Sequence, residues 1–102
     1  SAGSIFKNCD LKDASKRIQK KFSKVIKNDP FPVIPTAAIL TDAGLKGLKI
    51  GGAMVSPKHP NFIINAGGAK AKDVLKLINF IKRKIKSKYG ILLEAEIQTL
   101  GF

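Results

Sequence analysis

The fold is decided by the stretch KAKDVLKLINFIKRKIKSKYGILLEAEI, residues 70–97. From about residue 70 to 88 it predicts an amphipathic helix, because apolar residues recur at three- and four-residue steps and Gly90 can end the helix. Residues 91–97 predict a strand, in which Glu94 and Glu96 share one face. The apolar stripe consists of Val74, Leu77, Ile78, Ile81, Ile85 and Tyr89. The opposite face of the strand consists of Leu93, Ala95 and Ile97.

The first third of the chain predicts a strand, a helix and an extended connector. Residues 3–8 combine β-branched and aromatic residues between Gly and Asn, which favours a strand. Residues 11–26 have helical apolar spacing, with Asp10 as the candidate N-cap. Three prolines, which fix extended backbone, predict the connector. They are Pro30, Pro32 and Pro35.

The middle of the chain predicts shorter elements. Residues 36–43 favour a short helix that ends at Gly44. Three strands are expected, at residues 48–50, 53–55 and 62–65. The Gly51-Gly52 pair between the first two suggests a bulge or a close approach of the backbone to another segment. The residues expected to be buried by the short helix are Ala38, Ile39 and Ala43.

This order of elements predicts an α+β fold. We expect a two-layer domain with an antiparallel or mixed sheet of about four strands, flanked by two longer helices and one short helix. The 102 residues form one domain, 1–102, with little room for a deep cofactor cavity.

The net charge of +12 comes from 19 Lys+Arg against 7 Asp+Glu. Of these cations 17 are lysines, which favours a solvated helix surface over a site that grips phosphate, so nucleic acid is not the expected partner. Cys9 is the single cysteine and fits a reducing, cytoplasmic location. No apolar run approaches the roughly 20 residues that span a bilayer, so no membrane partner is expected.

The glycine run GLKGLKIGG, residues 44–52, is the first candidate binding motif. Its spacing matches neither the dinucleotide-binding nor the phosphate-loop pattern, so a turn and a bulge are favoured. Residues 44–47 do fit the G-x-x-G loop of KH domains, with Lys46 and Lys49 as contacts. A KH loop must lead into a helix, whereas residues 48–55 predict strands. A small basic KH-like nucleic-acid-binding module is therefore the alternative hypothesis.

Three polar residues are candidates for chemistry. His59 lies in a polar turn, where a surface role and a ligand contact remain equally open. It has no neighbouring carboxylates or thiolates in sequence, so no metal site is expected. Ser4 has no nearby base and by periodicity is a turn residue. Glu96 is an acid within an apolar strand, and exposure opposite a lysine is the favoured interpretation.

Several motifs in register resemble the UDP-N-acetylenolpyruvoylglucosamine reductase (MurB) family, specifically its C-terminal third. The resemblance covers residues 1–8 and about 34–101, whereas residues 9–33 match only loosely. It rests on SAGSIFKN (1–8), AGLKGLKIGGA (43–53), VSPKH (55–59), FIIN (62–65) and LEAEI (93–97).

The resemblance implies a flavoenzyme of peptidoglycan precursor synthesis. NADPH reduces FAD, and flavin N5 passes hydride to C3 of the enolpyruvyl ether of a UDP-sugar, giving UDP-N-acetylmuramate. Ser4 then falls on the proton donor to C2. Glu96 falls on the carboxylate that holds and polarises the substrate carboxylate, together with an arginine from another domain. Asn8 and His59 are expected to line the substrate site, and Lys7 to support the diphosphate.

Compared with the family pattern, this chain is expected to lack upstream domains, and it differs from the pattern at two positions. The FAD-binding domains and the catalytic arginine lie upstream in the family, so we expect residues 1–102 to be the C-terminal substrate-binding domain alone. The isolated chain is expected to be inactive and to bind neither FAD nor NADPH. Cys9 stands where the family usually has proline, and Gln98 where it usually has arginine.

Overall fold

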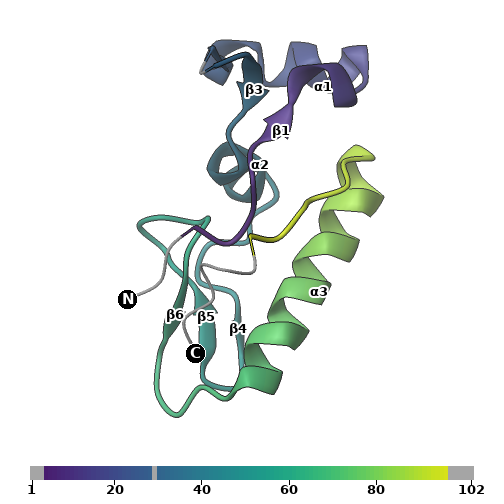
Figure 1. Cartoon of the computed structure of the whole chain (residues 1–102). Coiled ribbons are helices and arrows are strands. Elements are labelled where there is room, and N and C mark those ends of the chain that lie inside the picture. Colours follow the sequence, from purple (N-terminus) through teal and green to yellow (C-terminus); the bar gives the residue numbers. More distant parts are fainter. Residues whose placement is uncertain (1–3, 29, 97–102) are drawn as a thin grey trace.

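The computed structural model describes residues 4–28 and 30–96 and confirms an α+β fold (Figure 1). Its strands form two antiparallel three-stranded sheets, of order β1-β3-β2 and β4-β5-β6. In chain order the elements are β1 (Cys9–Asp10), η1 (Leu11–Asp13), α1 (Lys16–Lys21), η2 (Ser23–Val25), β2 (Lys27–Asn28), β3 (Pro32–Ile34), α2 (Thr36–Asp42), β4 (Lys49–Ile50), β5 (Ala53–Val55), β6 (Ile63–Asn65) and α3 (Ala71–Tyr89).

The expectation of one sheet of about four strands beside two longer helices was wrong. The segment with the prolines is not only a connector, because β3 pairs with β1 on one side and β2 on the other. Pro32 is tolerated there as the first residue of the strand, where a missing N–H does least harm. Of the described helices, only α3 is long.

The helix expected over residues 11–26 is broken into η1, α1 and η2. Ala14 has extended backbone (φ −100°, ψ 146°), and the side chain of Ser15, not Asp10, caps α1 by accepting the N–H of Ile18 at 3.2 Å. Gln19 Nε2 donates to two carbonyls that the break exposes, Leu11 O and Ala14 O. Tertiary packing keeps the expected apolar face buried at Ala14, Ile18 and Phe22.

The two later helices are confirmed. α2 ends before Gly44, whose φ of +74° is the left-handed stop. It buries Ile39 as expected, but also Thr36 and Leu40, while Ala38 and Ala43 are only partly buried. α3 buries its whole predicted stripe and ends at Gly90 (φ +70°).

The three central strands β4, β5 and β6 are confirmed, and the glycine pair marks a close approach. A Cβ at Gly52 would overlap Gly67 O and Ala69 N, and one at Gly51 would overlap the Asp73 carboxylate. Asp73 accepts the N–H groups of Gly52 (3.3 Å) and Lys70 (3.1 Å), which holds the pKa of its carboxyl below the usual range. These bonds join the start of α3 to the β4–β5 turn.

The strands expected at residues 3–8 and 91–97 were wrong for the parts that the structure describes. The two segments meet in a single antiparallel bridge between Phe6 and Ala95. Among the described residues neither continues as a strand, and on its other side the first segment bonds to the loop at Asn61. Residues 1–3 and Ile97 lie outside the described residues.

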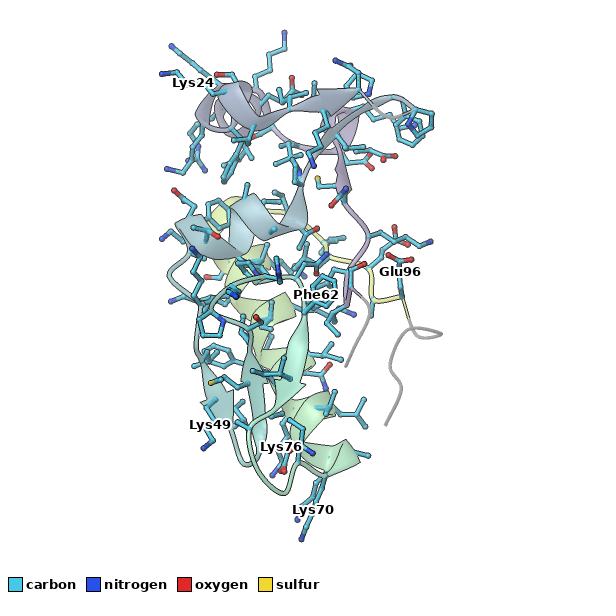
Figure 2. All side chains as sticks on the ribbon, turned by 90° about the vertical axis from the view of Figure 1, so that its left-hand side faces the viewer. Lys24, Lys49, Phe62, Lys70, Lys76 and Glu96 are labelled. Atoms are coloured by element: carbon cyan, nitrogen blue, oxygen red, sulfur yellow. The ribbon has the colours of Figure 1, made fainter. Side chains whose placement is uncertain are left out.

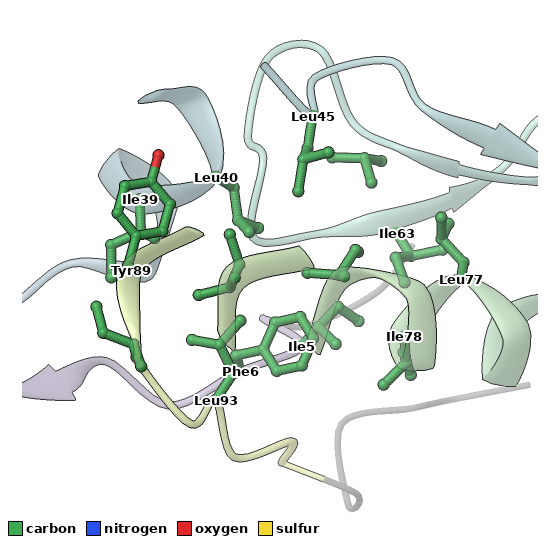
Figure 3. Close-up of a cluster of buried hydrophobic side chains, with 14 of the residues drawn as sticks. Ile5, Phe6, Ile39, Leu40, Leu45, Ile63, Leu77, Ile78, Tyr89 and Leu93 are labelled. Atoms are coloured by element: carbon green, nitrogen blue, oxygen red, sulfur yellow. The ribbon is translucent and has the colours of Figure 1, made fainter. Parts of the chain in front are cut away.

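One apolar core joins these pieces (Figure 3). It takes side chains from the first segment, α2, the β4–β6 sheet, α3 and residues 91–93, and so packs residues 5–6 and 91–93 against the same helices and sheet. Among the core residues are Ile5, Phe6, Ile39, Leu40, Leu45, Ile63, Leu77, Ile78, Tyr89 and Leu93.

Candidate functional site

The candidate site is built where residues 4–8, residues 94–96 and the loop between β5 and β6 meet. Lys7 N–H donates to Glu94 O at 2.9 Å, and Glu96 N–H donates to Ile5 O at 2.7 Å. These two bonds flank the Phe6–Ala95 bridge and align segments that are about 90 residues apart in the chain.

Asn61 fastens the loop to the same segment, and the sequence analysis missed it. Its backbone carbonyl accepts Ile5 N–H at 2.7 Å, its Oδ1 accepts Phe6 N–H at 3.0 Å, and its Nδ2 donates to Phe6 O at 2.8 Å. Asn61 is only 8% exposed. An asparagine after a proline normally signals a turn, so the local sequence carries no sign of this long-range role.

Ser4 and Glu96 are brought close together by this pairing. The backbone of Glu96 bonds to that of Ile5, the residue next to Ser4. Both Ser4 and Glu96 are partly buried, and the Glu96 side chain extends outward beside the first segment (Figure 2). The two residues predicted to do the chemistry therefore lie on paired segments, with Ser4 next to the residue that Glu96 bonds to.

Asn8 and Lys7 are exposed and are bound to the start of α2. Asn8 Oδ1 accepts Thr36 N–H at 3.0 Å, and Thr36 Oγ1 donates to Lys7 O at 2.7 Å. Asn8 thus caps a helix that lies 28 residues away in the chain. Because its Oδ1 is taken, its Nδ2 is the group that it can offer to a ligand.

A hollow of about 280 Å³ opens beside these two residues, lined among others by Lys7, Asn8, Cys9, Phe31, Leu92 and Glu94. Burial, then the Coulomb effects of Asp13 and Asp10, raises the pKa of the Cys9 thiol to about 11, so Cys9 is neutral at physiological pH. Of the five predicted residues, Lys7 and Asn8 line this hollow, whereas Ser4, His59 and Glu96 do not.

His59 is exposed on the loop that Asn61 anchors. Its backbone N–H donates to Ser56 Oγ at 3.1 Å, and its ring lies tilted on Phe62, with 5.8 Å between ring centroids. The ring is therefore held by the loop but open to a ligand. Its role stays a prediction.

Neither glycine motif forms the binding loop weighed from the sequence. Gly52 N–H points to Asp73, and the space beside both glycines of the 51–52 pair is filled by protein, so no phosphate cradle opens there. The G-x-x-G of residues 44–47 leads through Leu48 into β4, not into a helix, which is contrary to the KH arrangement.

The described residues contain neither a metal-ligand cluster nor a helix suited to crossing a membrane. Within residues 4–28 and 30–96, no cluster of three or more His, Cys, Asp or Glu side chains could hold a metal ion. In the same part of the chain, no helix has the length and apolarity to cross a membrane.

Comparisons with known proteins agree on one family. A family model described as the C-terminal domain of UDP-N-acetylenolpyruvoylglucosamine reductase matches residues 1–100. The enzyme of that name from Bacillus licheniformis is 44% identical over 95 residues, which is 93% of this chain and 31% of that protein. The one from Caldicellulosiruptor bescii is 57% identical over 63 residues, which is 62% of this chain and 20% of that protein.

A solved structure supports the same assignment. The crystal structure of UDP-N-acetylenolpyruvylglucosamine reductase (MurB) from Thermus caldophilus superimposes with a TM-score of 0.51 at 40% identity, over 71% of this chain and 24% of that one. The chain thus spans between 20% and 31% of the length of these three proteins. It belongs to the family of UDP-N-acetylenolpyruvoylglucosamine reductase C-terminal domains.

Proposed function

We propose that residues 1–102 form the substrate-binding domain of a longer, cytoplasmic reductase of peptidoglycan precursor synthesis. Its reaction is reduction of the enolpyruvyl ether of a UDP-sugar to the lactyl ether, UDP-N-acetylmuramate. The observation that carries the proposal is the Phe6–Ala95 bridge, because it aligns the segments that hold Ser4 and Glu96.

The hydride for this reaction would come from FAD, reduced by NADPH. The glycine pair at residues 51–52 offers no cradle for the diphosphate of a flavin, because the space beside it is filled by Asp73, Gly67 and Ala69. We therefore assign both cofactors to FAD-binding domains elsewhere in the longer protein. In this proposal the role of residues 1–102 is to bind the substrate and to transfer one proton to it.

Ser4 is the proton donor in this proposal. Its Oγ–H passes a proton to C2 of the enolpyruvyl group as the electron pair develops there. An unperturbed serine hydroxyl is a weak acid, so the transfer depends on holding it against a strongly basic carbon. The neighbouring backbone is fixed by Ile5 N–H on Asn61 O and by Glu96 N–H on Ile5 O, which favours such positioning.

Glu96 polarises the substrate carboxylate as negative charge builds up on it. Two carboxylates repel each other, so an arginine from another domain would balance the pair. Asn8 would offer its Nδ2 to the anionic substrate, and Lys7 would add electrostatic attraction. His59 would contact the substrate from the anchored loop.

The test uses the whole protein that carries this chain, loaded with FAD. Ser4→Ala should leave flavin reduction by NADPH within twofold of wild type but slow product formation from the UDP-sugar by about 10²- to 10⁴-fold. Glu96→Gln should also slow product formation. Ser87→Ala, on the exposed side of α3, is the matched control and should change neither rate. Wild-type product formation in Ser4→Ala would refute the assignment.

A further inference from the structure

The exposed surface of α3 carries seven cations, some on its outer face and others along the flanks of its buried stripe. The only acidic residue of the helix is Asp73, and its carboxylate already accepts the N–H groups of Gly52 and Lys70. Among the described residues, none of the seven lies within ion-pair distance of a carboxylate. Lys72 and Lys88 are near enough to Asp73 and Asp42 to interact with these carboxylates electrostatically, so the uncompensated positive charge comes from the other five cations. The cations are Lys72, Lys76, Lys82, Arg83, Lys84, Lys86 and Lys88, all exposed.

Four of these cations line one ridge of the helix. They are Lys72, Lys76, Arg83 and Lys86, whose spacings of four, seven and three residues keep them on one side of the helix. At a rise of 1.5 Å per residue, this row of cations is about 21 Å long. Figure 1 shows β4, β5 and β6 on the inner side of α3 and no other element on its outer side. Like charges four residues apart slightly destabilise a helix, so this pattern does not serve the helix itself.

Apolar surface adjoins the cations. Leu75 is 56% exposed and Leu92 is 72% exposed. A hollow of about 320 Å³ is lined by Leu92, Leu93, Lys82, Arg83 and Lys86, so apolar and cationic groups share its edge. Leu75 lies seven residues before Lys82, two turns along the same flank. Exposed apolar side chains beside cations are the combination by which an interfacial helix lies on a bilayer surface.

We propose that this face of α3 binds the surface of a bilayer containing anionic lipids, with the cations at the headgroups and Leu75 and Leu92 in the interface. Lysine, six of the seven cations, acts as a point charge and gains from anionic headgroups without a fixed geometry. Nucleic acid fits less well, because the aromatic residues of α3, Phe80 and Tyr89, are partly or fully buried and offer no stacking platform. A surface contact needs no spanning helix.

Sedimentation of the whole protein with vesicles tests the proposal. Binding should be strong to vesicles of 30% phosphatidylglycerol in phosphatidylcholine, weak to pure phosphatidylcholine, and should fall with added salt. Replacing three cations together, Lys76→Gln, Arg83→Gln and Lys86→Gln, should weaken binding about a hundredfold. Leu75→Ser with Leu92→Ser should weaken it several-fold. These side chains are exposed, and an unchanged circular dichroism spectrum checks that each variant is folded.

The matched control removes the same charge from the other end of the domain, with Lys12→Gln, Lys16→Gln and Lys24→Gln. It should weaken binding at most a few-fold. Phe31→Ser controls for loss of an exposed apolar side chain. Three results would overturn the proposal: no binding of wild type to anionic vesicles, equal loss in the control, or displacement of the vesicles by an RNA oligonucleotide that binds more tightly through the same residues.

Discussion

Asn61 and Phe6 exchange two hydrogen bonds although 55 residues separate them. Phe6 N–H donates to Asn61 Oδ1 at 3.0 Å, and Asn61 Nδ2 donates to Phe6 O at 2.8 Å. A side-chain amide has the same donor and acceptor as a peptide unit, so Asn61 takes the place of a neighbouring strand. The pair joins the segment that follows Ser4 to the loop that carries His59.

Replacing Asn61 by Ala should therefore destabilise the domain. The buried N–H and C=O of Phe6 would lose their partners, and we expect a loss of about 2–4 kcal/mol in the free energy of unfolding. Urea denaturation of the chain measures it. Asn79→Ala is the control, because Asn79 is exposed on α3 and should change stability by less than about 0.5 kcal/mol. Equal effects of the two variants would contradict the proposed pairing role.

Asn8 allows its structural and ligand-binding roles to be separated. Asn8→Asp keeps an oxygen that can accept Thr36 N–H, and a negative charge at the start of α2 suits the helix dipole. Its thermal stability should match wild type, whereas Asn8→Ala should lose about 1 kcal/mol.

The same pair of variants should differ in ligand binding. In the whole protein, Asn8→Asp should weaken the binding of the anionic UDP-sugar more than Asn8→Ala, because it adds repulsion to the loss of Nδ2. Calorimetric titration of substrate into each variant gives the comparison. Wild-type affinity in Asn8→Asp would show that Nδ2 makes no contact with the substrate.

Two glycines should respond differently to alanine. Gly52→Ala puts a Cβ against Gly67 O and Ala69 N, backbone atoms that cannot rotate away, and should cost about 3 kcal/mol of unfolding free energy. Gly44→Ala meets open space and bears only the cost of its left-handed φ, about 1 kcal/mol. Denaturant unfolding of both variants measures the two losses in unfolding free energy. If Gly44→Ala were the more damaging, the close approach at Gly52 would not be the controlling constraint.

Cys9 should react slowly with iodoacetamide. Its pKa of about 11 in the folded protein, against 9.0 for an ordinary thiol, leaves about a hundredfold less thiolate at pH 8. Because the pKa is raised, the alkylation rate should keep rising with pH toward 11. In the same chain unfolded in urea, the alkylation rate should level off about two pH units lower. Identical pH profiles in the two states would mean that burial and the Asp13 and Asp10 charges do not act on the thiol.

Much of the fold follows from local pattern. α2, α3 and the three strands β4 to β6 lie where apolar periodicity and glycine stops predict them, because in these segments one apolar face and one cap decide the structure. The motifs around Ser4 and Glu96 likewise predict the family without knowledge of any contact. The roles of these residues are still predictions.

Other features depended on partners distant in the chain. The pairing of β3 with β1 and the reduction of two expected strands to the Phe6–Ala95 bridge depend on hydrogen bonds between segments far apart in the chain. The break at Ala14, in contrast, is accompanied by local bonds of Ser15 and Gln19. Secondary-structure propensities, which are read over a short stretch of sequence, carry no information about hydrogen bonds to residues far along the chain.

By itself, the sequence determined the α+β class, the long helix with its buried stripe, and the family. Only the tertiary structure decided that the side chain of Asn61 would hydrogen-bond to the backbone of Phe6, that Asn8 would cap α2, and that the segments of Ser4 and Glu96 would pair. The physical reason is that buried backbone N–H and C=O groups must find partners. Which partner each finds depends on the packing of the whole core and not on its neighbours in the chain.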